Sequence, residues 1–136
     1  FMGIRESRVI RGKYILTVDD IVSLKRFEDV VAVAGYPVDI HHASGGDCTM
    51  IYCDDSYDLP YRVLVPETIG GLLVAGRCSS MDHGAMAATR VMSTCMALGE
   101  AAGTAARLAI DAGVPVADVD IKALQEELLK NDVFLG

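Results

Sequence analysis

The sequence lacks the features that mark several large functional classes. Its 12 Lys and Arg residues stand against 19 Asp and Glu residues and form no basic run. Nucleic acid binding is therefore not expected, because phosphate neutralisation needs clustered positive charge. The apolar runs, such as residues 72–75, are far too short to span a membrane. The first residues, FMGIRESR, carry charge and no apolar signal segment. These absences favour a cytoplasmic protein that binds neither nucleic acid nor membranes.

Paired cysteine motifs are also missing. The four cysteines, at positions 48, 53, 78 and 95, include no C-x-x-C, and the spacing between Cys48 and Cys53 has little metal or redox meaning. We expect free thiols in a reducing compartment and no metal site. Cys78 and Cys95 are expected to be small buried side chains.

A glycine-rich dinucleotide fingerprint, G-x-G-x-x-G, is absent as well, although residues 70–109 begin like a nucleotide-binding strand and turn. The apolar residues 72–75 predict a buried strand. Gly76 then permits a tight turn. One long helix is expected over residues 85–112, ending at Gly113 with Pro115 beyond it. The start of such a helix offers unpaired N–H groups and a positive dipole end, which favour an anion or a carbonyl oxygen.

Small residues recur every four positions in this helix, at Cys95, Gly99 and Gly103. This spacing places them on one helix face. Each glycine costs a helix about 1 kcal/mol relative to alanine, so a close approach is expected here. Either another element of the core or a planar ligand explains it, and the spacing does not decide between them.

The other expected elements follow from hydrophobic periodicity and capping residues. Together they predict an α/β or α+β fold in a single domain. The expected elements are a strand or hairpin arm over 8–16, a short helix from Val18 capped by Thr17, a strand or buried helix over 29–34, a strand edge over 36–40, an irregular stretch over 41–57, a strand over 60–65, a loop over 76–84, and an amphipathic helix over 121–130 capped by Asp120.

Four stretches, in order, resemble one family. They are GIRESRVIRGKYILTVDDI, GYPVDIHH, YDLPYRVLVP, and the segment from LLVAGR to RVMSTCMALGEAAGTAA. Together they are similar to the C-terminal, flavin-contacting part of FAD-dependent oxidoreductases with a glutathione-reductase-type fold, up to about residue 112. Any one stretch alone would be a weak match. Four in the same order are specific.

The resemblance implies FAD as cofactor and a small organic molecule as substrate. It implies that the turn and the helix start face the flavin ring, with the reduced ring stabilised by helix N–H groups. The residues it places at the cofactor are Gly76, Arg77, Arg90, Val91, Met92, Ser93 and Thr94. The residues it places at the substrate are His41, Tyr61 and Arg62. The candidates for a catalytic role are Arg90, His83 and His41.

These candidates have alternative interpretations. Arg90 either adds charge at the flavin, holds a substrate carboxylate, or pairs with a carboxylate such as Asp82. His41 and His42 either act on a substrate, ligate a metal, or lie in a solvated loop. His83 is either near the flavin or simply solvated. Arg62 is either a solvent-facing strand residue or a carboxylate clamp.

The chain departs from the family in two places. The N-terminal Rossmann unit that binds the adenosine half of FAD is absent, so the chain is expected to be a C-terminal fragment with weak or no FAD binding alone. Its expected parts are residues 1–66 on the substrate side, 67–113 at the flavin, and 114–136 as the C-terminal helix. Gly84 also replaces an acidic residue of the family pattern.

The missing half leaves two further expectations. Apolar surface is expected to be covered by a homo-oligomer or by a Rossmann partner. Two rival functions remain open: a non-catalytic association module, and a small metal-dependent hydrolase that uses the DIHH motif.

Overall fold

The structure is a computed structural model that describes residues 6–41 and 47–136. Within these ranges the chain mixes α-helices, 3-10 turns and antiparallel strand pairs, which confirms the expected α/β or α+β class. The helices are α1 (Val18–Val22), α2 (His83–Thr89), α3 (Met92–Ala112) and α4 (Ile121–Lys130). The strands are β1 (Val30–Ala34), β2 (Val38–His41), β3 (Cys48–Ile51) and β4 (Tyr57–Pro60), and 3-10 turns cover Tyr61–Val63, Gly76–Cys78 and Val116–Asp118.

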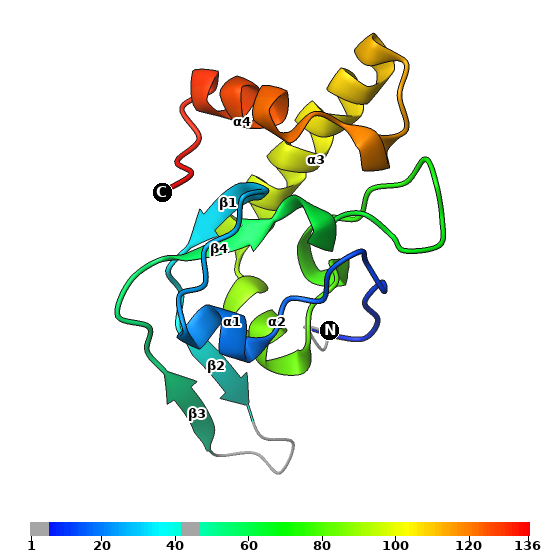
Figure 1. The fold of residues 1–136 in the computed structure, drawn as a ribbon. Coiled ribbons are helices and arrows are strands. Elements are labelled where there is room, and N and C mark those ends of the chain that lie inside the picture. Colours follow the sequence, from blue (N-terminus) through cyan, green and yellow to red (C-terminus); the bar gives the residue numbers. More distant parts are fainter. Residues whose placement is uncertain (1–5, 42–46) are drawn as a thin grey trace.

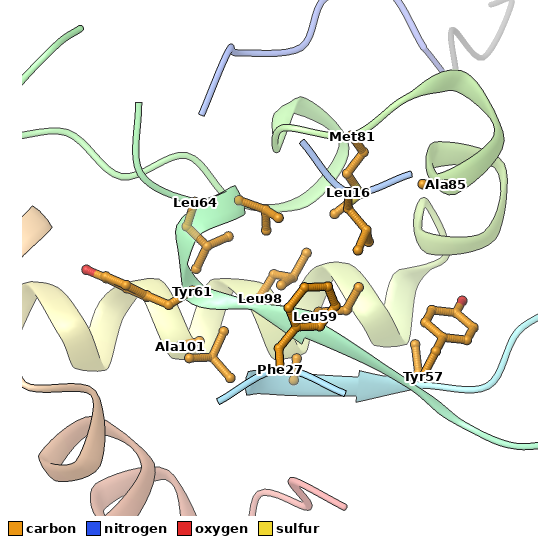
Figure 2. Packing of buried hydrophobic residues seen from close by; sticks show 14 of the residues in the cluster. Leu16, Phe27, Tyr57, Leu59, Tyr61, Leu64, Met81, Ala85, Leu98 and Ala101 are labelled. Atoms are coloured by element: carbon orange, nitrogen blue, oxygen red, sulfur yellow. The ribbon is translucent and has the colours of Figure 1, made fainter. Parts of the chain in front are cut away.

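The core lies between the β1–β4 pair and α3. β1 and β4 run antiparallel, with Val33 opposite Asp58 and a bulge between Val30 and Ala32. Figure 1 shows α3 passing behind this pair, and Figure 2 shows Leu59 and Leu98 in the space between them. Both side chains are fully buried. Apolar burial of this kind is the main favourable term for folding.

The C-terminal elements follow the sequence prediction closely. α3 ends at Gly113, which has the left-handed φ of 68° that a helix-ending glycine adopts. Asp120 caps α4 by accepting from the N–H groups of Lys122 and Ala123. Leu124 and Leu128 are the buried face of α4, which packs on the C-terminal half of α3 (Figure 1).

The α1 and α2 helices are tied together through their first turns. Thr17 and Asp20 form the expected cap of α1, in which each side chain accepts from the other's backbone N–H. Asp82 caps α2 through Ala85 and also accepts from the Val18 N–H at 3.1 Å. Figure 1 shows the two helices side by side. One carboxylate therefore fixes both helix starts.

The expected single helix over residues 85–112 is wrong, because the chain forms two helices there. α2 ends at Thr89 with Arg90 as its C-cap residue, and Val91 is extended with ψ near 156° before α3 begins. The expected loop over 76–84 accordingly ends two residues early, at Asp82, because α2 begins at His83. Thr89 and the β-branched Val91 are weak helix formers, but no Gly or Pro marks the break in the sequence.

Two predicted strands are also wrong. Residues 72–75 form no strand, because the backbone of Val74 bonds to the Leu64 carbonyl and to the Ser79 hydroxyl instead of to a neighbouring strand. The strand expected over 60–65 stops at Pro60. Asp29 then draws the chain into a 3-10 turn by accepting from both the backbone and the side chain of Arg62.

Two further expectations, for residues 8–16 and for residues 41–57, need correction. Residues 8–16, expected as a strand or hairpin arm, make only the isolated bridges of Gly12 with Pro66 and Leu16 with Met81 in the described structure. Within the irregular stretch expected over 41–57, β3 pairs antiparallel with β2. The four residues of β3 are exposed, so no buried hydrophobic pattern announces the strand.

Candidate functional site

The break between α2 and α3 brings a turn and a helix start together. Gly76, at the start of its 3-10 turn, has a φ of 74°, and a Cβ built on it would lie 3.6 Å from the Cys95 side chain. L-residues rarely adopt this φ, so glycine is required here by backbone conformation. The turn can therefore pass directly over the first turn of α3.

The start of α3 carries an uncapped positive end. Val91 is the N-cap residue and makes no side-chain capping bond. The N–H groups of Met92, Ser93 and Thr94 precede the first intrahelical bond and have no partner within the helix. The dipole of this 21-residue helix adds partial positive charge at the same place.

A mostly apolar hollow of about 580 Å³ lies between the turn and the helix. We call it the helix-start pocket. Its lining residues are Ala75, Gly76, Arg77, Met92, Cys95, Met96 and Gly99. Met92 is 80% exposed, and no described atom lies within 4 Å of a Cβ built on Gly99. The pocket is thus an open apolar surface beside a positive helix end.

A smaller and more polar hollow of about 260 Å³ adjoins it, and Arg77 lines both. We call this second hollow the arginine pocket. Its lining residues are Tyr36, Asp39, His41, Arg77, Ala87, Arg90 and Val91. The strand β2 supplies its acid and its imidazole, and the α2–α3 break supplies Arg90.

Among the described residues, the backbone of β2 holds Arg90. Its Nη2 donates to the Asp39 carbonyl oxygen at 3.0 Å. The alternative of a salt bridge to Asp82 does not hold, because Asp82 caps α2. No carboxylate of the described residues forms an ion pair with Arg90. Its guanidinium is therefore only partly satisfied.

His41 lies two residues from Asp39 along β2, on the same side of the strand. Its Nε2 is 3.0 Å from the Asp39 carboxylate. His42 lies outside the described residues. Over residues 6–41 and 47–136, no group of three His, Cys, Asp or Glu side chains is placed to hold a metal ion.

Tyr61 and Arg62 lie apart from these two pockets, in a third hollow of about 660 Å³ beside α4. Arg62 makes a two-pronged ion pair with Asp29, at 2.8 and 2.9 Å. Tyr61 is buried and donates its hydroxyl proton to the Val116 carbonyl at 2.7 Å. Burial raises the pKa of Tyr61 to about 12. The two side chains therefore hold elements together.

The remaining sequence candidates are dispersed. His83 is exposed, begins α2, and pairs with Glu6 at 2.8 Å, and it lines neither pocket. Ser93 is exposed and Thr94 is buried, and neither lines a pocket. The structure thus gathers Gly76, Arg77 and Met92 at one pocket and His41, Arg77, Arg90 and Val91 at the other.

Ala87 and Met96 line the pockets but were not singled out by sequence reasoning. Tyr36 and Asp39 belong to the GYPVDIHH stretch, within the part expected on the substrate side, and the β2 alternation places Asp39 with His41. Met96 lies next to the small-residue face of Cys95, Gly99 and Gly103. Close packing within the core does not explain that face, because a Cβ on Gly99 or Gly103 meets no described atom within 4 Å. Cys78 is exposed, not buried as expected.

The helix-start pocket suits a flat aromatic ring in chemical terms. An apolar face that lacks a side chain at Gly99 accommodates a flat ring, and the uncapped helix start favours the electron-rich edge of that ring.

No helix in the described part of the chain is long and apolar enough to cross a membrane.

Comparison with known proteins identifies the class. A family model described as FAD dependent oxidoreductase matches residues 1–128. The chain therefore belongs to the FAD-dependent oxidoreductase family. Searches of curated proteins and of solved structures found no match.

Proposed function

We propose that this chain is the C-terminal part of an FAD-dependent oxidoreductase with a glutathione-reductase-type fold. In this proposal it contributes the flavin-ring and substrate-side contacts for hydride transfer between a small organic substrate and FAD. The observation that supports it most is the adjacency of an apolar pocket at an uncapped helix start and a polar pocket lined by Arg90 and His41. Hydride transfer requires the flavin ring and the substrate to bind at adjoining sites.

The helix-start pocket would hold the ring. Gly76 and Gly99 leave room for its face, and the first-turn N–H groups of α3 lie beside it. Bound FAD would supply the hydride acceptor, and a substrate that gives up a hydride to it would also give up a proton. The helix start and Arg77 stabilise negative charge on the ring edge, an electrostatic effect that needs no rearrangement.

The arginine pocket would hold the substrate. Arg90 orients it through donors that no described carboxylate occupies. The His41 imidazole, oriented by Asp39 at 3.0 Å, is the group available to take the substrate proton. His83 is a weaker candidate for a catalytic role, because it pairs with Glu6 and lines neither pocket.

The organisation we propose has three parts: residues 1–66 on the substrate side, 67–113 at the flavin and 114–136 as a C-terminal helix. A Rossmann unit would bind the adenosine half of FAD and cover the exposed face of α3, where Met96 and Ile110 are 74% and 79% exposed. Light scattering tests whether a second copy covers this face instead. Four free thiols fit a reducing compartment such as the cytoplasm.

A titration with FAD tests the proposal. Flavin fluorescence and absorption should change on addition of a large excess of the chain, because binding by this part alone is expected to be weak. The Gly99→Leu substitution should weaken binding by roughly tenfold by filling the pocket. Gly103→Leu is the matched control, because Gly103 is an equally open helix glycine outside the pocket lining. If no flavin change occurs, or if both variants behave alike, the association module is the better account.

A further inference from the structure

We propose that the arginine pocket binds the carboxylate of a small organic acid, so that the substrate of the proposed oxidoreductase is a small carboxylate. This inference rests on the proposed function for the role of substrate. The binding site itself rests on the pocket's charge, donors and size.

The pocket carries more positive than negative charge. Arg77 and Arg90 both line it, and the acid in its lining is Asp39. The Asp39 carboxylate is already engaged by His41 at 3.0 Å. The whole chain has a net charge of -7, so this concentration of positive charge runs against the rest of the molecule. Positive charge in a pocket favours the binding of an anion.

The donors of Arg90 fit a carboxylate in particular. A guanidinium has five N–H donors in a planar fork, and one of them is directed to the Asp39 carbonyl oxygen at 3.0 Å. That bond anchors the group to β2 without neutralising its charge. The remaining edge of the fork can bind both oxygens of a carboxylate, a geometry that an ammonium group cannot offer.

Size and position narrow the ligand further. A hollow of about 260 Å³ accepts a small molecule and excludes a peptide or a nucleotide. Arg77 joins it to the helix-start pocket, so a bound acid lies beside the proposed ring site. The larger hollow beside α4 is a weaker candidate, because its Arg62 is bound to Asp29 on both prongs.

The test is a nuclear magnetic resonance titration of the isotope-labelled 136-residue chain with lactate, with lactamide as the uncharged control. We expect lactate to shift the side-chain signals of Arg90, Arg77 and His41, and lactamide to leave them unchanged. Equal shifts with both compounds, or none with lactate, would overturn the carboxylate site.

Variants assign the binding to this pocket. Arg90→Gln should weaken lactate binding by roughly tenfold, and Arg90→Lys should recover only part of it. Arg107→Gln is the matched control, because Arg107 lies near the far end of α3 and pairs with Asp111 and Glu127. Arg77→Gln is a second variant, used with a melting curve in case Arg90→Gln fails to fold. Unchanged lactate affinity in a folded pocket variant contradicts the proposal.

A parallel titration with riboflavin separates this inference from the proposed function. Lactate binding without riboflavin binding keeps the carboxylate site and overturns the flavin role. Riboflavin binding without lactate binding keeps the flavin role and overturns the carboxylate site. If Arg90→Gln weakens riboflavin but not lactate, Arg90 serves the ring and the carboxylate proposal is wrong.

Discussion

At the scale of single residues, the arginines of this chain divide by their partners. Arg62 donates through two side-chain nitrogens to Asp29 and lies 5.1 Å from the Tyr14 ring centre. Arg90 has a carbonyl oxygen as its partner. A paired guanidinium stabilises the fold, whereas one whose charge is not neutralised is available to a ligand. From the sequence alone, both arginines are candidates for binding a substrate carboxylate, with Arg90 the stronger one.

The first prediction concerns Arg62. The Arg62→Gln substitution should lower the free energy of unfolding by about 1–3 kcal/mol, because the nearly buried Asp29 carboxylate loses its guanidinium partner. Lactate affinity should not change, since Arg62 lies outside the arginine pocket. Chemical denaturation and the lactate titration measure the two effects. If the Arg62→Gln variant loses lactate binding while its free energy of unfolding is unchanged, Arg62 binds the substrate carboxylate and this prediction is wrong.

The second prediction concerns Asp20 at the start of α1. Burial alone would raise the pKa of its carboxyl group, but hydrogen bonds from Lys25, Thr17 and Tyr14 outweigh burial and lower the pKa below its ordinary value of 3.8. A lowered folded-state pKa contributes stability that is present above 3.8 and is lost as the pH falls through the folded pKa.

The Asp20→Asn variant should therefore be less stable than the wild type at pH 7, and the difference should shrink below about pH 4. Denaturation curves measured at about every half pH unit between roughly pH 2.5 and 7 give the free energy of unfolding of both proteins and check this. A stability difference that stays constant over this range would contradict the assigned pKa direction.

At the scale of elements, the sequence predicted those that depend on local residues. Thr17, Asp120 and Gly113 mark helix ends through bonds within a few positions, and the structure confirms all three. The elements that failed depend on distant partners. Residues 72–75 bond to a turn at Leu64, and β3 exists through pairing with β2. Periodicity carries no information on such partners.

The site could be predicted in part for the same reason. Motif resemblance pointed to Gly76, Arg77 and Arg90, which the structure gathers around two adjoining pockets. It also pointed to Tyr61 and Arg62, which lie at the other end of the β1–β4 pair. Asp39 already stood in the DIHH motif, whereas Met96 became apparent only when the turn at Gly76 and the helix α3 were placed side by side.

The third prediction concerns Gly84 in α2. A Cβ on Gly84 would lie 2.7 Å from the Val18 Cβ, so α1 leaves no room for the acidic side chain of the family pattern. Gly84→Ala should destabilise the chain by about 1–3 kcal/mol. Gly103→Ala is the matched control, since its Cβ meets no described atom, and it should stabilise by about 0.5–1 kcal/mol. Thermal melting distinguishes them, and equal effects would contradict the close α1–α2 contact.

At the scale of the whole molecule, the chain has one well-packed side and one open side. The buried face of α3, with Leu98, Ala101 and Ala105, packs on the β1–β4 pair. Its opposite face, with Met92, Met96 and Ile110, lies exposed. Such exposed apolar side chains mark a surface that a ligand or a partner covers. In the proposed function, the flavin ring lies against the pockets at the N-terminal end of this face.

The central claim is that this chain supplies contacts to the flavin ring and not to the adenosine half of the cofactor. A nuclear magnetic resonance titration with riboflavin, and separately with AMP, tests it most directly. The account predicts that riboflavin shifts the amide signals of Gly76, Arg77 and the first turn of α3, while AMP leaves them unchanged. Unchanged signals with riboflavin, or equal shifts with AMP, would contradict it.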